Sequence, residues 1–569
     1  MVVPPVAARR ALVAVAVVAL ALPALAGAVP NPVEPAANRT PTQATKIVLR
    51  YPKVADWLRR YPPKPITAAE YDAGTHRWTV RIWSGLAGEI ARAKIDDRTG
   101  AVTEAWTGPQ VAWKMARGRA GAFGGRTLTS WPFWLALSAL FFAGLADLRR
   151  PLCLRNLDVL ALLSFGVPLA FFNRGQIFQS VALTVPPLVY LLVRSAFIGF
   201  RSRPPKASRP VIPVWILLAA TLFTVGLRVG LNVQTERSVI DVGYAGVIGA
   251  SRILDGESPY GHMPQSDPLP ACGPADADGK VRDRIQANGR CEASNPHGDT
   301  YGPVAYLAYV PAVAVFGWSG KWDSLPAAHA SALLFDLVTL IGLFVLGRRL
   351  GGMRLAATLT FAWAAYPFTA YALMANTNDA LMPALLVWGF VFAGSAGARG
   401  AAVALAGWTK FAALLLVPLW LSYGAPENRI VRRGFVYGFV VASVVAFSIL
   451  LLEPDLIVAA RTFWQRTLEF QFQRDSPFSI WGWGQYHARG IPDLEPGRWA
   501  VQAGSIALAG IAAVYPRRRG PLELAALTSA ILIAAQLSLT HWFYLYLPWF
   551  LPFAVLAIVL PRPEANSPT

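Results

Sequence analysis

The stretch SVIDVGYAGVIGASRILDGESPY, residues 238–260, follows directly after a hydrophobic run and places an acidic side chain, Asp241, at its boundary. Ionisable groups at a membrane boundary are costly to desolvate, and those that persist usually face a water-filled cavity. Apolar runs of about 18 or more residues recur on both sides of this stretch, each long enough to cross about 30 Å of hydrocarbon. The chain is therefore predicted to be a polytopic α-helical membrane protein.

Composition supports this class. Of the 569 residues, 54% are hydrophobic and only 15% are charged, although the formal net charge is +20. The Lys and Arg residues are scattered at the ends of apolar runs, where cytoplasmic turns carry them. Because no basic stripe with interleaved aromatic residues is present, the positive charge does not indicate nucleic-acid binding. The expected surroundings are a lipid bilayer, and the expected location is the plasma membrane, crossed many times.

We expect about 11 to 13 transmembrane helices from runs of this length. The predicted spans are 131–148, 155–172, 177–200, 211–233, 326–347, 355–373, 380–396, 434–453, 498–515, 522–540 and 543–560. Two further apolar segments disturb the alternation of sides. Residues 300–318 are expected to lie along or dip into the outer face, helped by Pro303 and Pro311. Residues 401–421 are expected to form a broken or re-entrant hairpin that lifts Lys410 outward, or else a simple span whose lysine reaches to the interface.

The first 125 residues contain a targeting segment and a soluble unit. Residues 1–29 have basic, apolar and small-residue regions in the order of a signal peptide, and an uncleaved first transmembrane helix is the alternative. Either places residues 40–125 outside the cytoplasm. Helical periodicity in KIVLRYPKVADWLRRYP and alternation in HRWTVRIWSG and EIARAKIDDRTGAVTEAW predict a small α+β domain. A helix followed by a hairpin that ends at residues 97–100 resembles a PepSY-like domain, which implies an accessory binding module.

The membrane region divides into accessory helices at 127–210 and a main domain at 211–561, with a long external loop at 234–300. This loop contains Cys272 and Cys291. Two thiols in one loop that faces an oxidising compartment favour a disulfide. A zinc site is the alternative, but His262 and His297 do not have the close paired spacing of structural zinc ligands.

Short motifs recur in a distinctive order along the hydrophobic chain. They are Asp241, Tyr244, Leu254, Gly256, Pro259 and Tyr260; then Tyr301, Gly302 and Pro303; then NTNDALMPALLVWGF from Asn376, GWTKF with Lys410, and HWFYLYLPW from His541. This order resembles the GT-C glycosyltransferases over residues 211–560. Within that fold the chain is most similar to the polyprenyl-phosphate-sugar-dependent mannosyltransferases and arabinofuranosyltransferases of bacterial envelopes, the family 87-like enzymes. The family usually has YPP or HPP where this chain has Tyr301, Gly302 and Pro303.

The resemblance implies an inverting transfer of a sugar, mannose or arabinofuranose, from a polyprenyl-phosphate donor to a glycan or glycolipid acceptor outside the cytoplasm. It implies that Asp241 is the general base and that Lys410 belongs to a broken helix. Such a transfer also needs cationic or hydrogen-bonding groups for the leaving phosphate, and the candidates are Lys410, His541 and Arg252. The candidate substrate-binding residues are Tyr244, Tyr260, Tyr301, Asn378, Asp379, Trp481 and Trp483.

Each candidate has a structural alternative. Asp241 has the position of a helix cap before Val242, Asn378 and Asp379 have the position of a cap before Ala380, and aromatic residues near the outer boundary are typical of the membrane interface. No adjacent acidic pair accompanies Asp241, so neither a metal ion nor another cofactor is expected. The alternatives to an enzyme are a lipid-linked-sugar transporter, which would show inverted repeats, and a non-catalytic envelope assembly protein.

Overall fold

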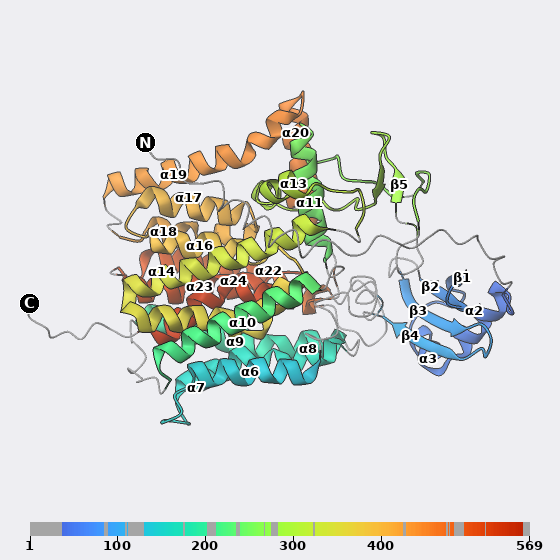
Figure 1. Ribbon diagram of the computed structural model, residues 1–569, viewed down its shortest axis with the longest axis horizontal. Helices are drawn as coiled ribbons and strands as arrows, with labels where there is room; N and C mark the ends of the chain where they lie inside the picture. Colours follow the sequence, from blue (N-terminus) through green and yellow to red (C-terminus); the bar gives the residue numbers. More distant parts are fainter. Residues whose placement is uncertain are drawn as a thin grey trace, which may run out of the picture.

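The computed structural model describes residues 37–560, except for 85–88, 109–110, 112–129, 174–176, 202–211, 235–238, 267, 275–280, 282, 323–324, 425–427, 474–475, 477, 483–493 and 518. Figure 1 shows a small α+β unit, residues 37–108, beside one end of a large helical domain that begins at residue 130. The expected targeting segment, residues 1–29, lies outside the described residues.

The small unit packs two helices against an antiparallel sheet with the strand order β1-β2-β3-β4. The helices are α2 (Pro41–Arg50) and α3 (Pro52–Leu58), and the strands are β1 (Ile66–Asp72), β2 (Arg77–Trp83), β3 (Glu89–Asp96) and β4 (Val102–Thr107). Alternate residues of β2 are buried, as a sheet with one covered face requires. The predicted α+β unit is confirmed, although the expected single helix is divided before Pro52, because a proline disfavours helical geometry in the residue before it.

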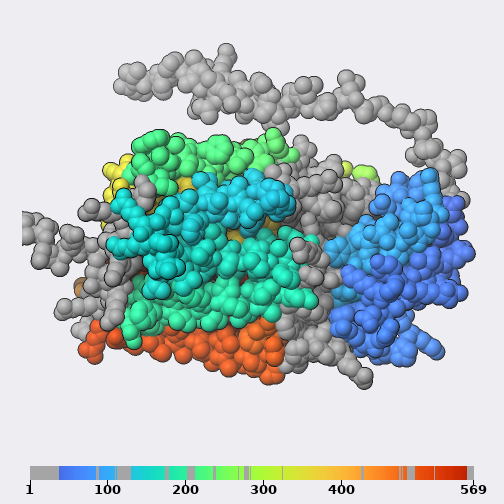
Figure 2. Space-filling view, turned by 90° about the horizontal axis from the view of Figure 1, so that it is seen from below, coloured from blue at the N-terminus to red at the C-terminus, as the bar shows by residue number. Residues whose placement is uncertain are grey.

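The first helices of the large domain cover one of its faces (Figure 2). They are α6 (Trp131–Leu145), α7 (Leu154–Ser164), α8 (Gly166–Asn173), α9 (Ile177–Arg201) and α10 (Val214–Gln234). Two glycines allow close packing on the later helices: a Cβ at Gly144 would lie 2.0 Å from the Phe361 ring, and one at Gly199 would lie 2.6 Å from Leu527. The accessory helices are thus packed firmly onto the main domain.

The remaining elements build the main domain and its loop. From α11 to α16 they are α11 (Asp241–Leu254), β5 (Asp283–Ile285), β6 (Cys291–Ala293), α12 (Pro303–Leu307), α13 (Val310–Phe316), α14 (Pro326–Ala365), α15 (Pro367–Met374) and α16 (Leu381–Val391). From α17 onward they are α17 (Ala396–Gly407), η2 (Phe411–Leu416), α18 (Val417–Leu421), α19 (Arg429–Phe447), η3 (Ser448–Leu452), α20 (Leu456–Trp464), the π-helical turn η4 (Gln465–Glu469), α21 (Phe470–Gln473), α22 (Glu495–Val514), α23 (Pro521–Leu537), η6 (Tyr544–Tyr546) and α24 (Leu547–Val559). The loop with β5 lies toward the same end as the small unit (Figure 1).

Five helical segments of the described chain are long and apolar enough to cross a membrane: 154–173, 179–201, 214–234, 326–365 and 429–452. Several other apolar helices are shorter, among them α6, α16, α23 and α24. The structure is therefore that of a mostly helical membrane protein, while the number of 11 to 13 spans stays a prediction.

The 40-residue element α14 is a pair of helices joined by a glycine turn. Gly352 has a φ of 69°, and Gly351 is also outside helical geometry. A Cβ at Gly347 would lie only 2.4 Å from the Cα of Ala356, so the chain folds back on itself across this turn. Two separate helices were expected here, at 326–347 and 355–373, and the turn between them agrees with that prediction.

Both irregular apolar segments are broken. Residues 300–318 form the five-residue α12 and the seven-residue α13, which are each too short to span about 30 Å of hydrocarbon. Residues 401–421 are interrupted between α17 and η2, where Lys410 is extended with φ −138° and ψ 113°. The expectation of a broken segment around Lys410 agrees with this geometry.

Candidate active site

The turn between α15 and α16 carries two of the predicted binding residues in a rigid backbone. Asn376 has a φ of 53°, a left-handed conformation that asparagine tolerates better than most residues. The side chain of Asn232 holds it by donating to the Asn376 Oδ1 and to the Leu373 carbonyl, both at 2.8 Å. The Asp379 amide then donates to Thr377 Oγ1 at 3.1 Å. Asn378 and Asp379 are both buried on this turn.

Asp379 forms a buried ion pair with Lys410. Lys410 Nζ lies 3.4 Å from Asp379 Oδ1, and the two side chains are 8% and 1% exposed. The same oxygen accepts a hydrogen bond from Trp549 Nε1 at 2.9 Å. A charge buried in a membrane domain is tolerated when it is paired and hydrogen-bonded, so this pair explains how Lys410 is kept inside the protein.

Three aromatic rings surround the ammonium group of Lys410. Its Nζ lies 5.1 Å from the ring centroid of Tyr301, 5.7 Å from that of Trp549 and 6.0 Å from that of Tyr546. Ring faces at this distance attract a cation. Together with Asp379 they form a cationic, aromatic-walled site built from four separate segments of the chain.

The Tyr301–Pro303 motif packs directly on the helix break. The Val304 amide donates to the Trp408 carbonyl at 3.2 Å, and a Cβ at Gly302 would lie 2.0 Å from the same oxygen. Glycine at 302 is thus required by this close backbone approach, which is where the chain departs from the YPP or HPP pattern. The contact brings Tyr301 beside Lys410.

Asp241 lies at the start of α11, and its side chain is exposed. Its Oδ1 accepts from the Val242 amide at 2.9 Å, and the positive end of the helix favours its negative charge. The preceding Ile240 amide donates to the Ala375 carbonyl at 3.0 Å, and a Cβ at Gly243 would lie 2.1 Å from the Asn376 carbonyl oxygen. The helix start that carries Asp241 is therefore seated on the turn that carries Asn378 and Asp379.

Three other predicted residues, Arg252, Tyr244 and Tyr260, form hydrogen bonds to the loop or to its end at Tyr301. Arg252 is 2% exposed and its guanidinium is engaged by both carboxylate oxygens of Glu292 and by the His262 carbonyl. In this structure Arg252 thus anchors the loop through Glu292, and its assignment as a phosphate ligand stays a prediction. The hydroxyl of Tyr244 donates to the Ala293 carbonyl at 2.6 Å, and that of Tyr260 to the Tyr301 carbonyl at 2.9 Å.

His541 and Trp481 contact residues other than those of the Lys410 site. His541 Nδ1 lies 2.7 Å from Ser476 Oγ, and the His541 ring meets the Phe478 ring edge to face at 5.3 Å. Trp481 Nε1 donates to the Leu537 carbonyl at 2.7 Å. The remaining aromatic candidate of the prediction, Trp483, lies outside the described residues.

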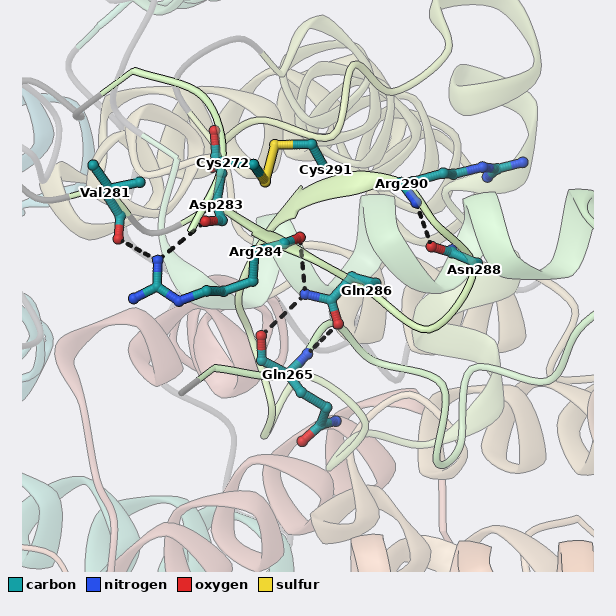
Figure 3. The surroundings of a disulfide bond; sticks show 9 residues. All are labelled: Gln265, Cys272, Val281, Asp283, Arg284, Gln286, Asn288, Arg290 and Cys291. Carbon is teal, nitrogen blue, oxygen red and sulfur yellow. Dashed lines mark hydrogen bonds between the residues drawn. A yellow bond between two sulfur atoms is a disulfide. The ribbon is translucent and has the colours of Figure 1, made fainter. Parts of the chain in front are cut away.

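The loop that contains β5 and β6 is folded around the pair Cys272 and Cys291, which form a disulfide (Figure 3). Figure 3 also shows Gln286, which donates to the Gln265 carbonyl at 3.1 Å and accepts from the Gln265 amide at 2.8 Å. Both thiols are thus used in the crosslink rather than as zinc ligands. Among the residues that the structure describes, no group of three or more metal-ligating side chains is found, and metal-independent chemistry stays a prediction.

Sequence reasoning missed Trp549, Tyr546 and Asn232. Trp549 and Tyr546 stand in the quoted HWFYLYLPW motif, but nothing local separates them from interfacial aromatic residues. Asn232 was detectable in principle, because an amide inside a predicted span at 211–233 needs a buried partner.

One comparison with known proteins matches the part of the chain that contains this site. No curated protein and no solved structure matches the chain. Residues 300–541 match the family described as Glycosyltransferase family 87; this range begins just before Tyr301 and includes Asp379, Lys410 and His541. Together with the apolar helices, this similarity supports a membrane glycosyltransferase related to family 87.

Proposed function

We propose that the protein transfers a sugar, mannose or arabinofuranose, from a polyprenyl-phosphate donor to a glycan or glycolipid acceptor of the cell envelope. The reaction takes place on the extracytoplasmic face, and the small α+β unit is an accessory, PepSY-like binding module there. The observation that carries the proposal is the buried pair Lys410–Asp379, which lies within the range similar to family 87 and beside the helix start that bears Asp241.

The chemistry assigned to the site is a single displacement. The acceptor oxygen attacks the anomeric carbon while Asp241 takes up its proton, and the bond from that carbon to the phosphate oxygen breaks with inversion. The electron pair of this bond stays on the leaving phosphate, whose charge Lys410 stabilises. Because Asp241 is exposed and seated on the turn, it is accessible to an acceptor hydroxyl.

The roles of the three rings around Lys410 follow from their positions, whereas Trp483 is assigned from the sequence alone. Tyr301, Tyr546 and Trp549 surround the lysine ammonium without neutralising it, so the charge becomes available to a phosphate that displaces Asp379. His541, which lies beside Ser476, is assigned as a second hydrogen-bonding group for the donor. Trp481 and Trp483 are assigned to the sugar or the prenyl chain.

The test uses membranes that contain the wild type or Asp241→Asn, incubated with radiolabelled polyprenyl-phosphate mannose or arabinose and envelope acceptors. We expect transfer by the variant to fall about 10²–10⁴-fold, the usual contribution of a general base. Donor binding and the melting temperature should be retained, because asparagine keeps an oxygen for the Val242 amide. Equal transfer by both proteins would defeat the mechanism, and transbilayer movement of the lipid-linked sugar without transfer would favour a transporter.

A second measurement concerns the metal. We expect activity to persist in EDTA, because in the proposed mechanism Lys410, rather than a metal ion, stabilises the negative charge of the leaving phosphate. Loss of activity in EDTA that manganese or magnesium restores would overturn this part of the proposal.

A further inference from the structure

Tyr309 stands next to the turn of Asn378 and Asp379, although it belongs to a different segment. It precedes α13, and its ring meets the Phe335 ring of α14 edge to face at 5.5 Å. One turn further along α14, Thr339 Oγ1 donates to the Ala380 carbonyl at 3.2 Å. The same face of α14 therefore contacts both Tyr309 and the end of the turn.

Helix α11 gives an independent route to the same neighbourhood. A Cβ at Gly246 would lie 2.5 Å from the Tyr309 ring, and a Cβ at Gly243, one turn earlier, would lie 2.1 Å from the Asn376 carbonyl oxygen. Residues three apart on a helix lie on one face. Asp379 is also close enough to act electrostatically on the Tyr309 phenol.

Tyr309, Asn378 and Asp379 share an uncommon property. The Tyr309 hydroxyl, both polar atoms of the Asn378 amide and Asp379 Oδ2 are all buried without a hydrogen-bond partner in the described structure. Protein interiors contain few such atoms, because each has lost water without gaining a partner. Three residues with this property in one neighbourhood indicate a place where stability is given up for function.

The chemistry of the three groups identifies what would satisfy them. A phenol, a carboxamide and a carboxylate offer hydrogen-bond donors and acceptors without a surplus positive charge, as the recognition of neutral hydroxyl groups requires. The charged group beside them is Lys410, which contacts the other oxygen of Asp379. The arrangement thus places hydroxyl-binding groups next to the cation assigned to the donor phosphate.

We propose that Tyr309, Asn378 and Asp379 form the subsite that reads the hydroxyl groups of the transferred sugar, an inference that rests on the proposed function. In the ligand-free protein this subsite is closed, and Lys410 is held at Asp379. An arriving phosphate competes with Asp379 for the ammonium group, and the sugar hydroxyls then supply the missing hydrogen-bond partners.

The test exploits the absence of partners in the free protein. Tyr309→Phe and Asn378→Leu remove polar atoms that satisfy nothing in the described structure. The thermal unfolding temperature of the full-length, ligand-free variants should therefore be equal to or above that of the wild type. Binding of polyprenyl-phosphate mannose or arabinose should weaken about tenfold for each lost hydrogen bond.

The matched control is Tyr366→Phe. The Tyr366 hydroxyl is buried but donates to the Leu162 carbonyl at 2.8 Å, so its removal should lower the unfolding temperature and leave donor affinity unchanged. Donors that lack single sugar hydroxyls add a second readout. For at least one deoxy donor, the wild type should bind no more tightly than Tyr309→Phe or Asn378→Leu. Such a donor lacks the sugar hydroxyl that the mutated side chain would bind, so the mutation removes no further hydrogen bond.

The outcomes separate the two proposals. If the wild type binds a lipid-linked sugar and both variants bind it equally well, the subsite is wrong and the proposed function stands. A lowered unfolding temperature in both variants would also contradict the subsite, because it would show that these groups have partners within the protein. If the wild type binds neither lipid-linked sugar, the proposed function fails and the subsite with it.

Discussion

Two buried aspartates, Asp97 in the small unit and Asp379 in the helical domain, are treated very differently by their surroundings. Asp97 accepts from the Asn38 amide at 2.7 Å, the Asn38 side chain at 2.8 Å, the Arg39 amide at 3.1 Å and Trp78 Nε1 at 2.8 Å. Asp379 also accepts from an indole, that of Trp549, and contacts Lys410, but its Oδ2 has no partner in the described chain. A fully satisfied carboxylate fixes a fold, whereas an incompletely satisfied one is available to a ligand.

The largest effect is expected at Lys410. Lys410→Met leaves the Asp379 charge buried without its counterion, which should lower the free energy of unfolding by about 3–5 kcal/mol and abolish transfer. Lys410→Met combined with Asp379→Leu should recover most of this stability but no activity, measured by thermal unfolding and by transfer of the labelled sugar. Full stability of the single variant would show that the pair is not the buried contact that the comparison assumes.

Asp97→Ala should affect the small unit alone. It leaves the donors of Asn38, Arg39 and Trp78 without an acceptor, and we expect a loss of about 2–3 kcal/mol in the stability of this unit. Hydrogen exchange of residues 41–107 in the full-length protein measures the loss, and the exchange of α14 serves as the internal control. If sugar transfer fell more than the amount of folded protein, Asp97 would have a role in activity, and the distinction between a structural Asp97 and a functional Asp379 would be wrong.

The two indoles provide a matched pair. Trp78→Phe and Trp549→Phe each remove one N–H donor to a carboxylate and keep an aromatic ring, and each should lower stability by about 1–2 kcal/mol. Only Trp549→Phe is expected to reduce transfer, because Asp379 positions Lys410. A reduction of kcat/KM by both variants, or by neither, would remove the functional distinction between the two carboxylates.

The smallest expected effect is the loss of stability of the small unit at low pH. Burial by itself raises the pKa of Asp97, but the hydrogen bonds from Asn38, Trp78 and Arg39 together lower this pKa below its ordinary value. The stabilisation is therefore complete above the unfolded pKa of about 3.9 and is lost as the pH falls toward the lower folded value. Hydrogen exchange of the small unit should increase in that window, and Asp97→Asn should flatten the dependence. An equally steep response in Asp97→Asn would assign the effect to other carboxylates.

Local pattern was a good guide wherever a feature depends on a few neighbouring residues. The small α+β unit, the turn at Gly351–Gly352 and the interruption near Lys410 were all expected from periodicity and charge. Arg252 shows what this guide misses: it was interpreted as a lone arginine near Asp241, but its ion-pair partner Glu292 is 40 residues away. Pairing over such a distance has no periodic signature in one sequence.

The candidate site divides in the same way. Asp379, Lys410 and Tyr301 were each chosen from short motifs, and the structure brings them together. Trp549 was not chosen, since it lies 170 residues from Asp379 and looks like any aromatic residue at a membrane interface. Tyr309 was not chosen either, because the lack of a hydrogen-bond partner for its hydroxyl arises only when the chain is packed.

The sequence by itself determined that the chain is a helical membrane protein with a small α+β unit, that its apolar segments are interrupted near Gly351–Gly352 and near Lys410, and which motifs resemble family 87. These follow from the length and period of apolar runs, from glycine and proline geometry, and from residue order. Only the tertiary structure decided that Lys410 is paired with Asp379, that Arg252 is paired with Glu292, and that the Tyr309 hydroxyl is buried without a hydrogen-bond partner in the described structure. The reason is that burial and the satisfaction of hydrogen bonds are set by contacts between distant segments, which local sequence does not encode.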